Sequence, residues 1–346
     1  MYLKDLVDIQ MGQSPDSKFY NYDKIGLPFY QGKADFGRIN PTPKIWCSKS
    51  KKEAKPNDIL ISVRAPVGDL NINNEQSCIG RGLAAITCKS DVDMMYLYYH
   101  LKYLKPQLSH ISTGSTFESI NRSQLENLII DYKPYSEQIK ISNILQVVQR
   151  QIEVREKLLR LYDLLIKSRF VEMFGDPNAT RTKYKLVPIH MVTDCMVPGR
   201  DKPKSFTGDI PWITINDLNI NGYTNKSKLG LGLTIDEVKE VNRKCVPQGS
   251  VLMSCVGNLG LCSIASVDVV INQQLHSYQC NEFINNLYLM YYLSFKNTYM
   301  NKIASSTTVL YMNKNACNNI PVLLPPIELQ ISFAKYLNRI NKLKFD

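Results

Sequence analysis

The sequence predicts an α+β protein in which two similar mixed α/β modules are joined by a long helix. Three observations lead to this prediction. The 346-residue chain is long enough for two domains of ordinary size. One stretch, from Tyr135 to about Phe170, contains neither Gly nor Pro and repeats apolar residues at helical spacing. The sequence after this stretch resembles the sequence before it, block by block and in the same order.

The central stretch carries two apolar seams. In the first seam the steps alternate between four and three residues, with Arg155 as the one polar break, which is typical of a coiled coil. Its members are Ile141, Leu145, Val148, Ile152, Leu159, Tyr162 and Ile166. The second seam runs through Ile144, Val147, Val154, Leu158, Leu161 and Leu165. Because two seams make a broad apolar face, we expect more than one packing partner. At 1.5 Å per residue, about 36 residues span about 54 Å, which suggests a spacer.

The repeat is carried by four blocks. The helical block DMMYLYYHLKY resembles NLYLMYYLSFK, and the other three pairs are Asp58–Gly68 with Ser250–Gly260, Cys78–Cys88 with Val270–Cys280, and Thr113–Gln138 with Ser305–Gln330. The offset is steady, because Asn313 lies 192 residues after Asn121 and Gln330 lies 192 residues after Gln138. The stretches between the blocks differ, as expected for two recognition modules with different targets. A duplication that has simply drifted explains the same pattern.

The remaining elements follow from local signals. Apolar runs at 58–67 and 82–89 predict strands, and the tyrosine-rich segment 94–104 predicts a helix. Gly175 and Pro177 end the long helix. A second long helix starts at about Ile327 and stops with the chain at Asp346, which makes it much shorter than the first. The predicted boundaries are therefore 1–134 and 176–326 for the modules, and 135–175 and 327–346 for the helices.

Composition limits the partners and the cellular setting. A net charge of +11 is explained either by a plain basic surface or by a polyanionic partner, most simply nucleic acid. No apolar run approaches the ~18 residues of a membrane span, and the N-terminus does not read as a signal peptide. The nine cysteines form no CxxC pair. We therefore expect a cytoplasmic protein with reduced thiols and no bound metal.

The sequence contains no strong pattern for catalysis or for cofactor binding. Gly26–Ala34 lacks the spacing and the Ser or Thr of a phosphate-binding loop. Gly80–Ala85 imitates a dinucleotide fingerprint, but without the strand–helix setting that this fingerprint needs. The four histidines have no neighbouring carboxylate or nucleophile pattern. These observations favour a binding surface over an active site.

Polar and cationic residues in the loops of both modules are the candidates for contact with DNA. Lysines suit phosphate groups, whereas amide and guanidinium groups pair with base edges in the major groove. Ser/Thr clusters before each long helix suit helix capping first and phosphate contact second. In the first module the candidates are Gln31, Lys33, Arg38, Lys51, Lys52, Arg64, Arg81, Ser115 and Thr116. In the second they are Arg200, Lys202, Lys204, Thr214, Asn216, Asn258, Gln273, Gln274, Thr307 and Thr308.

The order of these blocks resembles the specificity subunit of type I restriction-modification enzymes, over nearly the whole chain. The strongest marks are the linker before each helix and the helix exit MFGDP. The linker residues are Pro134, Glu137 and Gln138, repeated as Pro325, Pro326, Glu328 and Gln330.

The resemblance implies that each module is a target recognition domain that reads half of a bipartite DNA site. The long helices would form an antiparallel coiled coil that sets the distance between the half-sites. The subunit would not be catalytic and would bind no cofactor itself. It would dock two methyltransferase subunits, which use adenosylmethionine, and two restriction subunits, which use ATP and magnesium. The expected subunit interface is Ile141, Leu145, Val148, Ile152, Leu159, Tyr162, Ile166, Phe333, Leu337 and Ile340.

The short second helix departs from the usual form of this family. We expect the far half of the first helix to need a partner chain or a second copy of this chain. Two other interpretations stay open. The chain is the recognition part of a single-chain restriction-modification enzyme, or it is a coiled-coil adaptor whose modules bind proteins.

Overall fold

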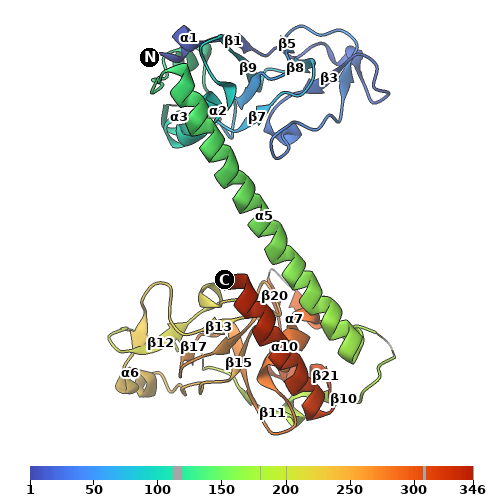
Figure 1. Cartoon of the computed structure of the whole chain (residues 1–346). Coiled ribbons are helices and arrows are strands. Elements are labelled where there is room, and N and C mark those ends of the chain that lie inside the picture. The colour runs from blue at the N-terminus through green and yellow to red at the C-terminus, as the bar shows by residue number, and fades with distance from the viewer. Residues whose placement is uncertain (112–118, 180, 200, 307–308, 346) are drawn as a thin grey trace. The chain divides into compact units, whose positions relative to one another are not determined.

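The computed structural model describes residues 1–111, 119–179, 181–199, 201–306 and 309–345. The chain forms two compact units, Met1–Arg155 and Glu156–Asp346, which we describe separately (Figure 1). Helix α5 (Tyr135–Phe174) contributes its first part to the first unit and its last part to the second.

The long helix predicted from the sequence is confirmed. It begins at Tyr135 and continues through Phe174 rather than stopping at Phe170. Gly175 ends it in the left-handed conformation, with φ at 86°. The Gly175 N–H donates to the Val171 carbonyl at 2.8 Å, as in a glycine-terminated helix.

The first unit contains two sheets. The antiparallel four-stranded sheet has the order β1-β9-β6-β7, with bounds β1 (Val7–Met11), β9 (Leu83–Cys88), β6 (Ile59–Ser62) and β7 (Leu70–Ile72). The mixed sheet has the order β2-β4-β3-β8-β5, with bounds β2 (Tyr20–Asn21), β4 (Trp46–Cys47), β3 (Leu27–Tyr30), β8 (Ser77–Ile79) and β5 (Glu53–Ala54). Both apolar runs predicted as strands are strands, β6 and β9.

The first sheet is covered on both faces, which explains its continuous apolar strands. Ile59 and Ile61 pack in a core with Leu101 of helix α2 (Met94–Tyr103), whereas Leu60 faces a second core with Tyr30. This alternation is the two-residue period of a strand. The helices and single turns of this unit are α1 (Leu3–Leu6), η1 (Ser17–Phe19), η2 (Lys33–Asp35), α2 (Met94–Tyr103), α3 (Lys105–Ile111) and α4 (Arg122–Glu126).

The second unit repeats this plan. Its five-stranded sheet has the order β11-β18-β15-β16-β13, with bounds β11 (Thr193–Met196), β18 (Leu275–Cys280), β15 (Val251–Ser254), β16 (Cys262–Ala265) and β13 (Tyr223–Thr224). The smaller sheets are β14-β12-β17, β10-β21 and β19-β20, with bounds β14 (Gly232–Leu233), β12 (Ile210–Ile213), β17 (Val270–Ile271), β10 (Leu186–Pro188), β21 (Pro321–Leu323), β19 (Ser305–Ser306) and β20 (Leu310–Tyr311). The helices and single turns are η3 (Ile189–Met191), η4 (Ile215–Asp217), α6 (Ile235–Glu240), α7 (Asn286–Phe295), α8 (Asn297–Ile303), α9 (Lys314–Asn318) and α10 (Ile327–Phe345).

The last turns of α5 belong to the core of the second unit. Ile166, Phe170 and Phe174 are buried there, and the Phe170 and Phe174 rings lie 5.3 Å and 5.6 Å from the Phe333 ring of α10. Further back along α5, Asp163 pairs with Lys344 at 2.7 Å. From Phe170 back to Asp163 on α5, the contacted residue on α10 moves forward from Phe333 to Lys344. The two helices therefore pack antiparallel and lie side by side in Figure 1.

The middle of α5 has no such cover within the described part of the chain. Ile144 and Val154 are 63% and 57% exposed, although both belong to the predicted second seam. Of the predicted interface, Ile166, Phe333, Leu337 and Ile340 are buried, Ile141 and Tyr162 are half-buried, and Leu145, Val148, Ile152 and Leu159 are exposed. The partner of the exposed set stays a prediction.

Candidate nucleic-acid interface

Three loops of the first unit meet at one edge of its mixed sheet. Strands β3 and β8 run parallel, with Tyr30 opposite Ile79, so the loops that follow them leave at the same edge. A third loop joins them because the Val63 N–H donates to the Gly82 carbonyl at 2.9 Å. We call loops 31–35, 64–68 and 80–82 the first three-loop edge.

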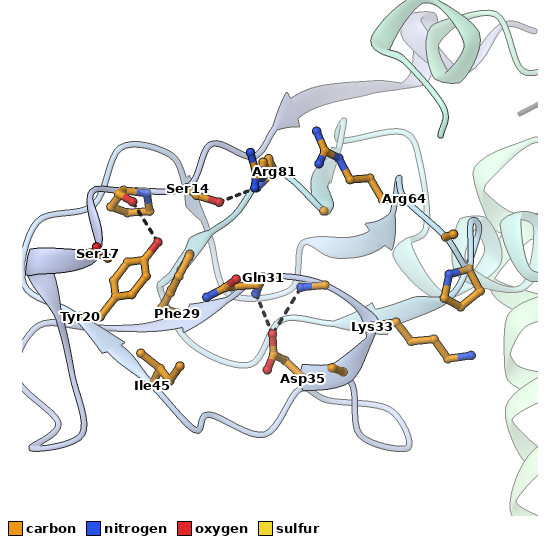
Figure 2. Close-up of a pocket in the computed structure, with 16 residues that line it drawn as sticks. Ser14, Ser17, Tyr20, Phe29, Gln31, Lys33, Asp35, Ile45, Arg64 and Arg81 are labelled. Atoms are coloured by element: carbon orange, nitrogen blue, oxygen red, sulfur yellow. Dashed lines mark hydrogen bonds between the residues drawn. The ribbon is translucent and has the colours of Figure 1, made fainter. Parts of the chain in front are cut away.

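These loops surround a cleft of about 1060 Å³ (Figure 2). Tyr20 and Phe29 line it with aromatic rings 4.7 Å apart. Figure 2 shows Arg64 and Arg81 on one side of the cleft and Asp35 on the other, with Gln31 between them. The cleft therefore combines guanidinium, amide and carboxylate groups at the end of a rigid sheet.

Glycine 82 is required by the close approach of two of these loops. A Cβ atom at Gly82 would lie 2.2 Å from the Gln31 carbonyl oxygen, a distance that no side chain tolerates. At Gly80 an added Cβ would lie 3.2 Å from the Gln31 Cα. The backbone around Arg81 is thus packed directly against the backbone of Gln31.

Asp35 holds the first loop in shape. Its Oδ2 atom accepts hydrogen bonds from the Gln31 N–H at 2.7 Å and from the Gly32 N–H at 3.3 Å (Figure 2). This is a capping interaction on the single turn η2. The carboxylate is used to fix the backbone that presents Gln31 and Lys33.

Asp69 ties the first loop to the rest of the unit. Its two oxygens lie 2.8 Å from Lys33 Nζ and 2.5 Å from Lys105 Nζ. Partial burial opposes ionisation of this carboxyl, but hydrogen bonds and charge from Lys105 and Lys33 outweigh burial and lower its pKa. Lys33, predicted as a DNA contact, is therefore already engaged in an ion pair.

Arg64 and Arg81 are in a different situation. Both side chains are exposed at the rim of the cleft, and neither forms an ion pair within the part of the chain that the structure describes. Both also line a second, adjoining cavity of about 420 Å³. Their guanidinium groups are available to a ligand.

The second unit builds the same edge. Strands β12 and β17 are parallel, with Ile213 opposite Ile271, and the Asn272 N–H donates to the Ile213 carbonyl at 3.0 Å. The Cys255 N–H donates to the Gln274 carbonyl at 2.9 Å, which repeats the Val63–Gly82 bond 192 residues later. Loops 214–217, 256–260 and 272–274 form the second three-loop edge.

The carboxylate of Asp217 corresponds to that of Asp35. Its Oδ2 accepts from the Thr214 N–H at 2.8 Å and from the Thr214 hydroxyl at 2.7 Å, and its Oδ1 accepts from the Lys228 N–H at 2.7 Å. The side chain is buried, which disfavours the charged form, yet these hydrogen bonds prevail and lower its pKa. The Thr214 hydroxyl is therefore already engaged in a hydrogen bond within its own loop.

The two edges differ in charge. At the 192-residue offset, Val256 stands where the first unit has Arg64, and Gln273 stands where it has Arg81. The predicted residues Asn216 and Asn258 are exposed on the second edge, whereas Gln273 and Gln274 are half-buried. The two edges share their backbone arrangement but differ in the side chains that they carry.

Other predicted DNA contacts lie elsewhere. Arg38 pairs with Glu153 of α5 at 3.0 Å, and Lys204 pairs with Glu240 at 3.4 Å. Lys51, Lys52 and Lys202 are exposed but do not line the cleft of the first unit. Ser115, Thr116, Arg200, Thr307 and Thr308 lie outside the described residues.

The sequence reading missed three residues that shape these edges: Asp35 as a cap, Asp217 and Arg243. The Arg243 guanidinium is buried, stacks on Trp212 at 4.8 Å, and donates to the Asp201 and Ile271 carbonyls at 2.6 Å and 2.7 Å. Burial lowers its pKa. An Asp closing a short turn after a strand in both modules was the available signal for the two caps.

None of the helices that the structure describes is long and apolar enough to cross a bilayer.

Comparison with known proteins identifies the family. The model of the type I restriction modification DNA specificity domain matches residues 1–160 and 197–346. A putative type I restriction enzyme MjaX specificity subunit of Methanocaldococcus jannaschii is 45% identical over 150 residues, which cover 43% of this chain and 35% of that protein. The MjaIX specificity subunit of the same organism is 28% identical over 185 residues, which cover 50% of this chain and 43% of that protein.

The chain thus spans less than half the length of these relatives. The crystal structure of the type I restriction-modification S subunit from M. genitalium covers 99% of this chain and 91% of its own, with a TM-score of 0.60 at 14% identity. This likeness confirms the predicted fold of two similar α+β modules with a long helix. Because the family model covers most of both modules, the chain belongs to the family of type I restriction modification DNA specificity domains.

Proposed function

We propose that this chain is the DNA-reading specificity subunit of a type I restriction-modification complex, and that each three-loop edge reads one half of a bipartite duplex site. The observation that carries this proposal is the repeated frame. Both units hold three loops at the end of two parallel strands by equivalent backbone hydrogen bonds, and they display different side chains there. A shared frame with exchanged side chains is what two readers of different sequences need.

Cations away from the edges would supply sequence-independent affinity. Lys51, Lys52 and Lys202 are exposed on loops, and the chain carries a net charge of +11. Contacts of this kind with phosphate groups position a protein on a duplex without reading its sequence.

The chemistry would belong to partner subunits. We infer that the chain itself is not catalytic and holds no cofactor, and that it docks two methyltransferase subunits and two restriction subunits. The exposed apolar side chains of α5, such as Ile144, Val147 and Val154, offer a surface for these partners or for a second copy of the chain. Adenosylmethionine, ATP and magnesium would be bound by the partners in the cytoplasm.

The test is affinity selection of the full chain, alone and with its methyltransferase partner, from a pool of duplex DNA with a long random segment. We expect two enriched blocks separated by a spacer of fixed length. Binding to the enriched duplex should weaken steeply as salt rises, because phosphate contacts release counterions. Enrichment of no motif in either setting, or binding that ignores salt, would overturn the proposal in favour of a protein-binding adaptor.

A further inference from the structure

We propose that the first three-loop edge recognises guanine through Arg64 and Arg81, and that the second edge reads its half-site without a guanidinium at these positions. This inference rests on the proposed function and deepens it, because it names the base edge that one unit selects. It predicts that one half-site depends on a guanine contact made by this pair.

The backbone of Arg81 is fixed before any ligand binds. Its N–H donates to Ser14 Oγ at 3.3 Å, and the Leu83 N–H donates to the Gly80 carbonyl at 3.0 Å, which closes the turn around it. Gly80 and Gly82 place this turn against Gln31 with no room for a Cβ at position 82. The turn therefore carries one long side chain between two residues that have none, which lets a duplex approach closely.

The loop that carries Arg64 is equally constrained. Ser62 Oγ donates to the Pro66 carbonyl at 2.7 Å and accepts from the Asp69 N–H at 2.9 Å, so it spans the whole loop. The Val63 N–H donates to the Gly82 carbonyl at 2.9 Å, and the Val63 carbonyl accepts from the Ile120 N–H at 3.0 Å. Arg64 and Arg81 are thus each next in sequence to a residue of the Val63–Gly82 hydrogen bond, which holds the two loops together.

The carboxylates near this edge have other partners. Asp69 is held by Lys33 and Lys105, and Asp35 accepts from two backbone N–H groups. Both carboxylates are engaged within the protein, and neither forms an ion pair with Arg64 or Arg81 among the described residues. Two exposed guanidinium groups on fixed loops therefore face the ligand together.

Guanine suits this pair better than phosphate does. A guanidinium fork donates two parallel hydrogen bonds to O6 and N7 of guanine, a geometry that needs a fixed side chain. Phosphate contacts carry no sequence information and need not differ between half-sites, yet the equivalent residues of the second unit are Val256 and Gln273. Positions that change from cationic to neutral between repeats are those expected to vary with the base that is read.

The experiment repeats the random-duplex selection with the full chain carrying R81Q or R64V, which install the residues of the second unit. We expect each variant to lose preference at a G·C pair in one block, with the other block unchanged. Affinity for the wild-type motif should fall about ten- to hundredfold per lost bidentate contact. R81K keeps the charge but not the fork, and it should lose the same base preference. K52Q is the matched control for loss of charge alone.

The outcomes are distinguishable. If wild type selects a bipartite motif that R81Q, R81K and R64V leave intact, with only a uniform loss of affinity and a smaller salt slope, the arginines contact phosphate and the guanine assignment is overturned. If wild type selects no motif, the proposed function falls as well. Thermal unfolding of each variant within a few degrees of wild type checks the fold, since both side chains are exposed.

Discussion

Gln138 and Gln330, 192 residues apart, make the same three hydrogen bonds in their two units. Gln138 Oε1 accepts from the Asp93 N–H at 2.9 Å, and its Nε2 donates to the Asp91 and Lys133 carbonyls at 3.1 Å and 2.8 Å. Gln330 Oε1 accepts from the Asn285 N–H at 2.8 Å, and its Nε2 donates to two carbonyls at 3.1 Å and 2.8 Å. Each buried amide joins the start of a long helix to the start of a tyrosine-rich helix.

Replacing either glutamine should destabilise its own unit. Q138A or Q330A leaves one N–H and two carbonyls without their partners at a partly buried site, which costs roughly 2–4 kcal/mol of unfolding free energy. Denaturant unfolding measures the loss. Q151A, on an exposed position of α5, is the control and should change stability by less than about 0.5 kcal/mol. Equal effects of Q151A and Q138A would contradict the bracing role.

The caps Asp35 and Asp217 should act as positioning residues for the two edges. D217N puts an amide N–H₂ among groups that donate to the carboxylate, so we expect a loss of about 1–3 kcal/mol and altered selection in one DNA block only. D35N lies at a half-exposed site and should cost less stability while altering the other block. Selection of an unchanged motif by both variants would rule out this role.

Acid should release the bond between Asp69 and its lysines. The pKa of this carboxyl lies below its ordinary value of 3.8 in the folded protein. Its contribution to stability is therefore fully present above about pH 4 and is lost as the pH falls through the folded pKa. We expect the difference in unfolding free energy between wild type and D69N to shrink over this range. A difference that is constant with pH would refute the assignment.

The length of α5 should set the spacer between the half-sites. Inserting one heptad between Gln146 and Arg160 adds about 10 Å of helix, close to three base pairs. We expect the selected spacer to lengthen while both blocks stay the same. A variant in which seven residues are exchanged without insertion controls for the change of sequence. An unchanged spacer in the insertion variant would exclude the ruler role.

Phe170 should be essential to the second unit. Its ring is fully buried and lies 5.6 Å from Tyr288 and 5.3 Å from Phe333. F170A should cost about 3–5 kcal/mol, because a cavity replaces a ring in contact with several others. V171A, at a position that is 39% exposed, should change little. Proteolysis and denaturant unfolding of the second unit would report the difference, and equal stability of the two variants would show that α5 is not part of this core.

Much of the architecture could be predicted because it depends on local patterns. The α5 helix follows from apolar spacing and from Gly175, and the relation between Gln138 and Gln330 follows from a constant offset. The loop edges could not be predicted in the same way. Strands β3 and β8 are short and come from distant parts of the chain, and their register rests on hydrogen bonds between backbones, which no side-chain pattern records.

The candidate DNA-binding residues fall into two groups, those whose exposure local sequence signals predict and those whose ion pairs only the fold reveals. The sequence placed Arg64 and Arg81 in loops because of their Gly and Pro neighbours, and both side chains are exposed. It also proposed Lys33 and Arg38, which fold against Asp69 and Glu153. Ion pairs of this kind join residues far apart in the chain, so only the folded structure separates engaged cations from available ones.

The sequence by itself thus determined the class of the protein, its internal repeat and its long helix, because apolar spacing and a constant repeat offset depend only on the order of residues along the chain. Only the tertiary structure decided which loops meet, that Asp35 and Asp217 fix them, and that two arginines stand open on one edge while Val256 and Gln273 replace them on the other. The reason is physical: a recognition surface is made by contacts between segments, and contacts between segments exist only after folding.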